Sequence, residues 1–412
     1  MGGEKPLKHV ENTIVVQHDW HLSLKNSISQ FYIGVKRVGA EKTEYFDVQV
    51  TKLIDEFSFT VLPENGTVKA SEFAVSLDES KYLHVTFNNK TMVFVSPSQE
   101  QTVDGFESAP HSIDLSVTTA TYVVADASGN LAVHDAKHNK TVRSLSGHVM
   151  DIYRCLYFPS GLVVLAAGMD MAIRIWPVDT GVCVRTLKGH TQAVTGLGIF
   201  GLGKQIVSCS NDGTARIWTC GTGETTHTYS FEAGKCLDVA AAPNGKRFAV
   251  ICKRNLLSVV NLDAENSRHD IQLPSEPSAI CFSEDDSGEV AFVGFEDGHV
   301  AAYSTADQKL IGEVYTTKGS VTCVKHKGSR LLVSFNSGAV TTYQVPTLAS
   351  LAAGDAPDGI KAEYQLTGPD CDPVYDMSME GLTVATCCRD HKVRLYTFKP
   401  NCEQNEKKED RK

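Results

Sequence analysis

Three side chains near the middle of the chain have the chemistry of a hydrolase. His190, Ser208 and Asp212 could supply the base, the nucleophile and the orienting carboxylate of a Ser-His-Asp triad. The sequence around Ser208 has no nucleophile elbow, however, and the same residue types recur at a fixed interval along the chain. We therefore interpret the trio as structural, and the sequence predicts no catalytic residues and no enzyme activity.

The recurrence is a repeat of 42 residues between two similar segments that end at Trp176 and Trp218. The equivalent positions are His148 and His190, Asp170 and Asp212, and Trp176 and Trp218. Within each unit apolar and polar residues alternate, as in half-buried strands, and Asp212-Gly213 is a hairpin turn signal. A period of 40 to 45 residues with Gly-His and a terminal Trp resembles the WD40 family, which implies an all-β propeller with four strands in each blade.

The resemblance also implies a role for the recurring polar residues. In WD40 blades the histidine, a strand Ser or Thr, the turn aspartate and the tryptophan form a chain of hydrogen bonds. The set is complete here in His190, Ser208, Asp212 and Trp218. The other unit has His148, Asp170 and Trp176, but Ala166 occupies the hydroxyl position. We therefore expect the chain of hydrogen bonds in that unit to be broken or bridged by water.

Further units can be counted on both sides of this pair, which predicts a seven-bladed propeller. The first begins near His111 and has Ser128 and His134 at the Asp and Trp positions. Degenerate units follow over 234–263, 276–303, 318–343 and 373–396. The last of these has Thr386, Asp390 and Tyr396 at the Ser, Asp and Trp positions.

The remaining segments predict the domain organisation. Residues 1–88 lie outside the repeat and read as a small, mostly-β N-terminal domain with a helix near Leu22 to Gln30. The propeller is expected over 89–398, with 89–97 as a strand that pairs with the last blade and closes the ring. Residues 346–358 are expected to form a long loop in the sixth blade, and 399–412 to form a polar tail.

Composition narrows the class of protein. The formal net charge of −10 argues against a nucleic-acid binder and favours a basic partner. No apolar run approaches the roughly 20 residues that a membrane helix needs, and none reads as a signal peptide. None of the twelve cysteines forms a Cys-x-x-Cys pair, so we expect free thiols in a reducing compartment and no metal site or cofactor.

Several longer segments are more specific than the repeat and indicate one family of propeller proteins. The segments are GHVMDIYRCLYFPSGLVVLAAGMD, SNDGTARIWTCG and GPDCDPVYDMSMEGLTVATCCRD, with Gln17-His18-Asp19-Trp20 near the N-terminus. They resemble the proteasomal ATPase-associated factor family, most closely over 140–220 and 368–396. The resemblance implies a chaperone for assembly of the proteasome regulatory particle, located in the cytoplasm and the nucleus. Such a protein binds the C-terminal domain of a proteasomal ATPase subunit through the propeller rim and blocks premature docking on the core particle.

Blade geometry predicts which residues lie on that rim. The turns that carry Asp170 and Asp212 and the loops that carry His148 and His190 should lie at one end of the blades. We expect partner-binding residues there, several of them acidic and therefore suited to a basic surface. The candidates are Asp151, Tyr153, Met169, Asn211, Glu232, Glu296, Asp372, Tyr375, Asp376 and Arg389.

Other functions remain open on the sequence. A substrate receptor or scaffold of a ubiquitin ligase is the main alternative, although Trp176-Pro-Val-Asp179 and Trp218-Thr-Cys-Gly221 lack the Trp-Asp-x-Arg word of many such propellers. An RNA-associated propeller is disfavoured because no basic patch with interleaved aromatics is present. The closed ring leaves few strand edges, so we expect a monomer.

Overall fold

The computed structural model describes residues 13–25, 29–37, 42–52, 57–62, 72–79, 81–103, 105–138, 140–263, 267–284, 289–346 and 360–399. Regular structure in these ranges is almost entirely β, with a single four-residue helix, α1 (Trp20–Ser23). The described ranges include no helix with the length and apolar character needed to cross a membrane. The predicted loop over 346–358 and the predicted tail over 399–412 lie outside them apart from Pro346 and Lys399.

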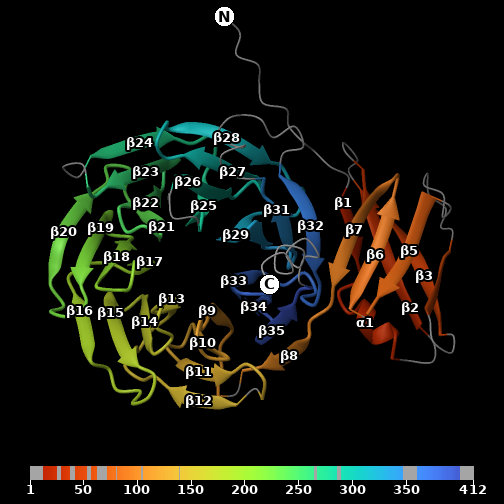
Figure 1. Ribbon diagram of the computed structural model, residues 1–412, viewed down its shortest axis with the longest axis horizontal. Coiled ribbons are helices and arrows are strands. Elements are labelled where there is room, and N and C mark those ends of the chain that lie inside the picture. The colour runs from red at the N-terminus through yellow and green to blue at the C-terminus, as the bar shows by residue number, and fades with distance from the viewer. Residues whose placement is uncertain are drawn as a thin grey trace, which may run out of the picture.

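Seven sheets surround a central axis, and Figure 1 shows them as a ring with further strands at one side. The innermost strands are β9 (Pro110–Leu115), β13 (Ile152–Tyr157), β17 (Val194–Phe200), β21 (Cys236–Ala241), β25 (Pro277–Phe282), β29 (Val321–Lys327) and β33 (Val374–Glu380). Each contacts the next, and β33 contacts β9, so the ring is closed. This is the architecture of a β-propeller, and we number its blades 1 to 7 from β9 to β33.

The second, third and fourth strands of each blade follow in order from the axis outward. In blades 1 to 4 they are β10 (Thr121–Asp126), β11 (Leu131–Asp135) and β12 (Thr141–Ser144); β14 (Val163–Gly168), β15 (Ala172–Pro177) and β16 (Arg185–Lys188); β18 (Gln205–Ser210), β19 (Thr214–Thr219) and β20 (Thr225–Ser230); and β22 (Arg247–Cys252), β23 (Leu256–Asn261) and β24 (Arg268–Gln272). In blades 5 to 7 they are β26 (Val290–Phe295), β27 (Val300–Ser304) and β28 (Lys309–Val314); β30 (Arg330–Phe335), β31 (Val340–Gln344) and β32 (Lys361–Leu366); and β34 (Thr383–Cys388), β35 (Lys392–Thr397) and β8 (Gln99–Thr102).

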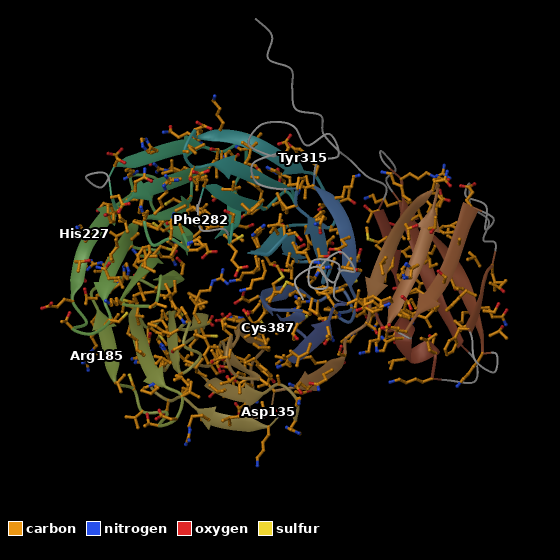
Figure 2. The ribbon with its side chains drawn as sticks, in the orientation of Figure 1. Asp135, Arg185, His227, Phe282, Tyr315 and Cys387 are labelled. Carbon is orange, nitrogen blue, oxygen red and sulfur yellow. The ribbon has the colours of Figure 1, made fainter. Side chains whose placement is uncertain are left out.

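The hydrophobic core of the ring lies between neighbouring sheets. Leu165 and Ile173 of blade 2, for example, pack with Leu197 and Trp218 of blade 3. The second and third strands are buried along most of their length, whereas the outermost strands are mainly exposed or half-buried. In Figure 2, Asp135, Arg185 and His227 lie toward the outside of the ring and Cys387 lies nearer the axis. The blade core therefore comes from the inner three strands, and the fourth strand covers it.

The strand that closes the ring is β8, and the expectation for 89–97 is wrong. β8 pairs antiparallel with β35, from Gln99 opposite Leu395 to Thr102 opposite Lys392. Glu100 on β8 forms ion pairs with Lys392 and with Arg394, the latter at 2.8 Å. The sequence of β8 is polar, with alternate residues half-buried and none fully buried, so hydrophobic alternation did not reveal it.

The segment expected to close the ring belongs to the N-terminal part. β7 (Lys90–Val95) pairs antiparallel with β6 (Tyr82–Phe87), which pairs with β5 (Phe73–Asp78). β7 also pairs in parallel with β32, so the three strands extend the sheet of blade 6 outward. Figure 1 shows these strands beside the ring. The boundary expected at residue 88 thus cuts through one β-hairpin.

A second N-terminal sheet packs against this extension. Its strands, in order, are β1 (Thr13–Val16), β2 (Ser29–Lys36), β3 (Glu44–Lys52) and β4 (Phe57–Val61). Phe31 and Phe46 from this sheet share one buried cluster with Phe87 and Phe94 from the extension. The mostly-β character expected of the N-terminal domain is therefore present, and its core is its own.

The helix expected near Leu22 to Gln30 is wrong, because Gln30 lies on β2 and α1 has only four residues. α1 begins at the fully buried Trp20, whose indole N–H donates to Thr367 Oγ1 at 3.0 Å. Thr367 lies between β32 and β33, so this bond fixes the N-terminal domain to the junction of blades 6 and 7.

The expected chain of hydrogen bonds is complete in blade 3. Trp218 Nε1 donates to Ser208 Oγ at 2.8 Å, and Ser208 Oγ lies 2.8 Å from His190 Nε2. His190 Nδ1 lies 2.9 Å from Asp212 Oδ2. Burial lowers the pKa of His190. Burial alone would raise the pKa of Asp212, but hydrogen bonds led by that from Thr214 lower it overall.

Blade 2 breaks the chain at Ala166, as its sequence predicts. His148 Nδ1 still lies 2.9 Å from Asp170 Oδ2. Trp176 Nε1 instead donates to the carbonyl oxygen of Ser146 at 3.0 Å. Blade 7 uses the equivalent carbonyl, because Tyr396 Oη donates to Thr367 O at 2.8 Å. In blades 2 and 7, where the hydroxyl–histidine pair is missing, a backbone carbonyl oxygen thus accepts the hydrogen bond of the Trp176 or Tyr396 side chain.

We predict that Asp212→Ala lowers the free energy of unfolding by about 1–3 kcal/mol, because it removes the acceptor of the buried His190 ring and of the Thr191 amide. Urea unfolding followed by tryptophan fluorescence would measure this. Asp179→Ala, at an exposed turn of blade 2, is the control and should change stability by less than about 0.5 kcal/mol. Equal effects of the two substitutions would contradict the assignment.

Candidate protein-binding surface

One end of the propeller carries two sets of connections, which we call the upper rim. The first set precedes the innermost strand of each blade, and the second joins the second and third strands. The 2.9 Å contacts of His148 with Asp170 and of His190 with Asp212 each join a connection of one set to one of the other. His148, Asp170, His190 and Asp212 therefore lie in the connections of the upper rim.

Nine of the ten residues expected on this rim are accessible to some degree. Met169, Glu232, Glu296 and Arg389 are exposed, and Asp151, Tyr153, Asn211, Asp372 and Tyr375 are half-buried. They come from the rim connections or from the first two residues of an innermost strand. The structure therefore spreads them over blades 2, 3, 4, 5 and 7 and does not gather them at one point.

A smaller group meets at the upper end of the central axis, between blades 7, 1 and 2. Asp151 Oδ1 lies 2.9 Å from His111 Nδ1. The His111 ring packs edge-on against Tyr375, with 4.8 Å between ring centroids. Asp372 is held by Arg389 at 2.9 Å. Asp151 and Tyr375 thus form one continuous surface through His111, a residue that sequence reasoning did not select.

Asp376, the tenth candidate, is buried and does not lie on the rim. Asp376 Oδ2 accepts from Ser112 Oγ at 2.7 Å, and Oδ1 pairs with Arg154 Nη1 at 3.0 Å. Arg154 Nη2 also pairs with Asp238 at 3.0 Å. Arg154, Asp238 and Asp376 are the third residues of β13, β21 and β33, so one arginine joins blades 2, 4 and 7 across the axis.

The two blades between these partners carry small residues at the same position. Blade 1 has Ser112, which donates to Asp376, and blade 3 has Gly196. A Cβ atom at Gly196 would lie only 2.7 Å from Asp238 Oδ1. The small residues thus leave room for the arginine to reach both carboxylates.

The network sets the ionisation of its members. Burial alone would raise the pKa of Asp376, but Arg154 and then Lys325 lower it overall. Burial alone would lower the pKa of Arg154, but Asp238 and Asp376 raise it. The axis is therefore filled by a compensated ion network whose role is structural.

A cleft of about 570 Å³ lies between α1 and blade 7. Its lining includes His18, Asp19 and His21 from the N-terminal domain, and Asp370 and Asp372 from the rim. His18 Nδ1 lies 3.4 Å from Asp370 Oδ1. The cleft thus brings together two sequence words from opposite ends of the chain. Among the described residues, no group of three or more His, Cys, Asp or Glu side chains is arranged to hold a metal ion.

Comparison with known proteins adds to this geometry. The family described as "WD domain, G-beta repeat" matches residues 139–177, which run from β12 to β15, and residues 181–219, which run from β16 to β19. These are the segments that carry the His–Asp contacts and the tryptophans. Blades 2 and 3 therefore contain WD40 repeats. Propellers of this kind are typically scaffolds for protein–protein interaction rather than enzymes.

One curated relative extends the similarity beyond the two repeats. The chain is 24% identical over 151 residues to "Probable proteasomal ATPase-associated factor 1" of Dictyostelium discoideum. The similar region covers 37% of this chain and about a third, 34%, of the relative. The chain is therefore weakly similar to a protein whose name refers to the proteasomal ATPases.

We predict that Asp376→Ala lowers the free energy of unfolding by about 3–5 kcal/mol, because it removes one of the two carboxylates that pair with Arg154, whose side chain is only 15% exposed. Since the folded-state pKa of Asp376 is depressed, its contribution is present above the unfolded pKa and is lost as pH falls through the folded value.

Urea unfolding at pH 7 would test this, with Asp151→Lys as the control on the rim. The control should lower the free energy of unfolding by no more than about 1 kcal/mol, because Asp151 loses only its partly exposed contact with His111 and lies outside the Arg154 network. An unchanged stability of Asp376→Ala would contradict a structural role for the network.

Proposed function

We propose that this protein is an assembly chaperone of the proteasome regulatory particle that binds the C-terminal domain of a proteasomal ATPase subunit. The observation that carries the proposal is the similarity to a protein named as a probable proteasomal ATPase-associated factor. The sequence words GPDCDPVYDMSMEGLTVATCCRD and Gln17-His18-Asp19-Trp20 support it, because both resemble that family. The protein acts as a non-enzymatic monomer in the cytoplasm and the nucleus.

The upper rim is the surface that contacts the ATPase. Asp151, Asp372, Glu232 and Glu296 place carboxylates there, and the chain as a whole has a net charge of −10. A basic surface on the ATPase domain would complement them and would be steered toward them at low ionic strength. The rigid ring then covers that surface of the free subunit, which blocks docking on the core particle until the neighbouring subunits have assembled.

Affinity purification of the tagged full-length chain, followed by mass spectrometry, tests the proposal. We expect one or two proteasomal ATPases without core-particle subunits. Recovery of cullin adaptors without ATPases would overturn the proposal in favour of a ubiquitin-ligase receptor or scaffold. Recovery of ribonucleoprotein components without ATPases would also overturn it.

For the ATPase identified in this way, we predict that Asp151→Lys weakens binding about tenfold at low salt, because it reverses a charge at the rim. Titration calorimetry with the ATPase C-terminal domain would measure the dissociation constant. The matched control is Asp179→Lys, which reverses an exposed charge in the connection between β15 and β16, away from the upper rim. Equal affinities of the two variants would contradict binding through this rim.

A further inference from the structure

Four large apolar side chains are exposed together on the upper rim of blade 2. Val149 is 77% exposed and Met150 48%, in the connection before β13. Met169 is 50% exposed and Met171 43%, in the turn between β14 and β15. The amide of Met169 donates to the carbonyl oxygen of Asp151 at 2.8 Å, so the two segments lie side by side. We call these four residues the methionine patch.

The patch concentrates a scarce residue type. The chain has seven methionines, and three of them lie here. The thioether is polarisable and the side chain has three rotatable bonds, so methionine adapts its shape to an apolar partner and is common at binding surfaces. Single exposed apolar residues are ordinary on protein surfaces, but four adjacent ones mark a candidate contact.

Met171 also adopts a backbone conformation that methionine disfavours. Its φ is 62°, in the left-handed region. The equivalent turn position is glycine in blades 1, 3, 5 and 6, namely Gly129, Gly213, Gly298 and Gly338, all with positive φ. A Cβ atom makes this conformation costly, but His391 has a φ of 64° at the equivalent position of blade 7, so the turn also accepts larger side chains.

The patch rests on a rigid base. Beneath it, Asp170 is bound by His148 and by Arg174, and His148 packs against the buried Trp176 ring. The rim segments that carry the patch are therefore fixed before any partner arrives. A preordered backbone loses less conformational entropy on binding, although the methionine side chains still lose rotamer freedom.

Acidic residues flank the patch along the neighbouring blades. Asp151 follows Met150 directly. In blade 1, Ser108 bonds to Ser128, and Gly129 approaches the Met150 backbone, which brings the exposed Glu107 to the same side. An occupant of this surface therefore needs apolar side chains with lysine or arginine beside them.

We propose that the methionine patch is the apolar anchor for the ATPase subunit, and that it receives a surface of the C-terminal domain in which apolar side chains are flanked by basic ones. This inference rests on the proposed function and adds the chemistry of the contact. The flanking carboxylates steer the approach, whereas desolvation of the methionines supplies most of the affinity.

The test compares full-length variants in titration against the ATPase domain that co-purifies with the wild type. Met150→Glu/Met169→Glu should raise the dissociation constant by about 30-fold or more, as expected for the loss of an interface anchor. Met150→Leu/Met169→Leu keeps apolar side chains and should stay within about threefold of the wild type. Since the anchor is apolar, this penalty should persist at 0.5 M NaCl, where the effect of Asp151→Lys fades.

The matched control is Leu162→Glu/Leu202→Glu. These leucines are 62% and 88% exposed in the turns before β14 and β18, at the end of the blades opposite the upper rim. This control should bind like the wild type. If Met150→Glu/Met169→Glu binds within about twofold of the wild type, the anchor is wrong while the proposed function stands. If the wild type binds none of the proteasomal ATPase domains, the proposed function is wrong, and so is the partner proposed for the methionine patch.

Discussion

Closing seven sheets around one axis forces their innermost strands together, and the polar side chains there need partners. Arg154 meets this constraint by pairing with Asp238 and Asp376, which come from blades on either side of its own. The serine and the glycine at the equivalent positions of blades 1 and 3 leave the space that this arginine crosses. The ion pairs of Arg154 therefore cross-link three blades at the axis, and they also hold the adjoining rim in place.

The N-terminal domain makes the ring asymmetric. β5, β6 and β7 extend blade 6 outward, and Trp20 is inserted at the junction with blade 7. A cleft forms where this domain meets the rim of blade 7, while the methionine patch lies on blade 2. A partner that approaches the upper rim therefore meets chemically distinct surfaces on the two sides of blade 1. Such asymmetry can fix the orientation of a bound domain.

The sequence predicted what repeats and missed what occurs once. The 42-residue spacing located His148, Asp170, His190 and Asp212 because every blade imposes the same local geometry. Asp376 was predicted to lie on the rim. In the structure it occupies the position in β33 that Arg154 occupies in β13, and Arg154 follows Asp151 by three residues. The strand β8 and the contact of Trp20 depend on pairings with distant segments, and local alternation carries no information about them.

The closure of blade 7 has a consequence for how the protein is made. β8 precedes the other strands of all seven blades, but its partner β35 is the last strand among the described residues, and Glu100 and Lys392 are 292 residues apart. A ribosome extends a chain by about 5–20 residues each second, so β8 waits for roughly 15–60 s without its partner. Its polar sequence, with glutamine, glutamate and threonine, protects this unpaired edge from association with other nascent chains during that interval.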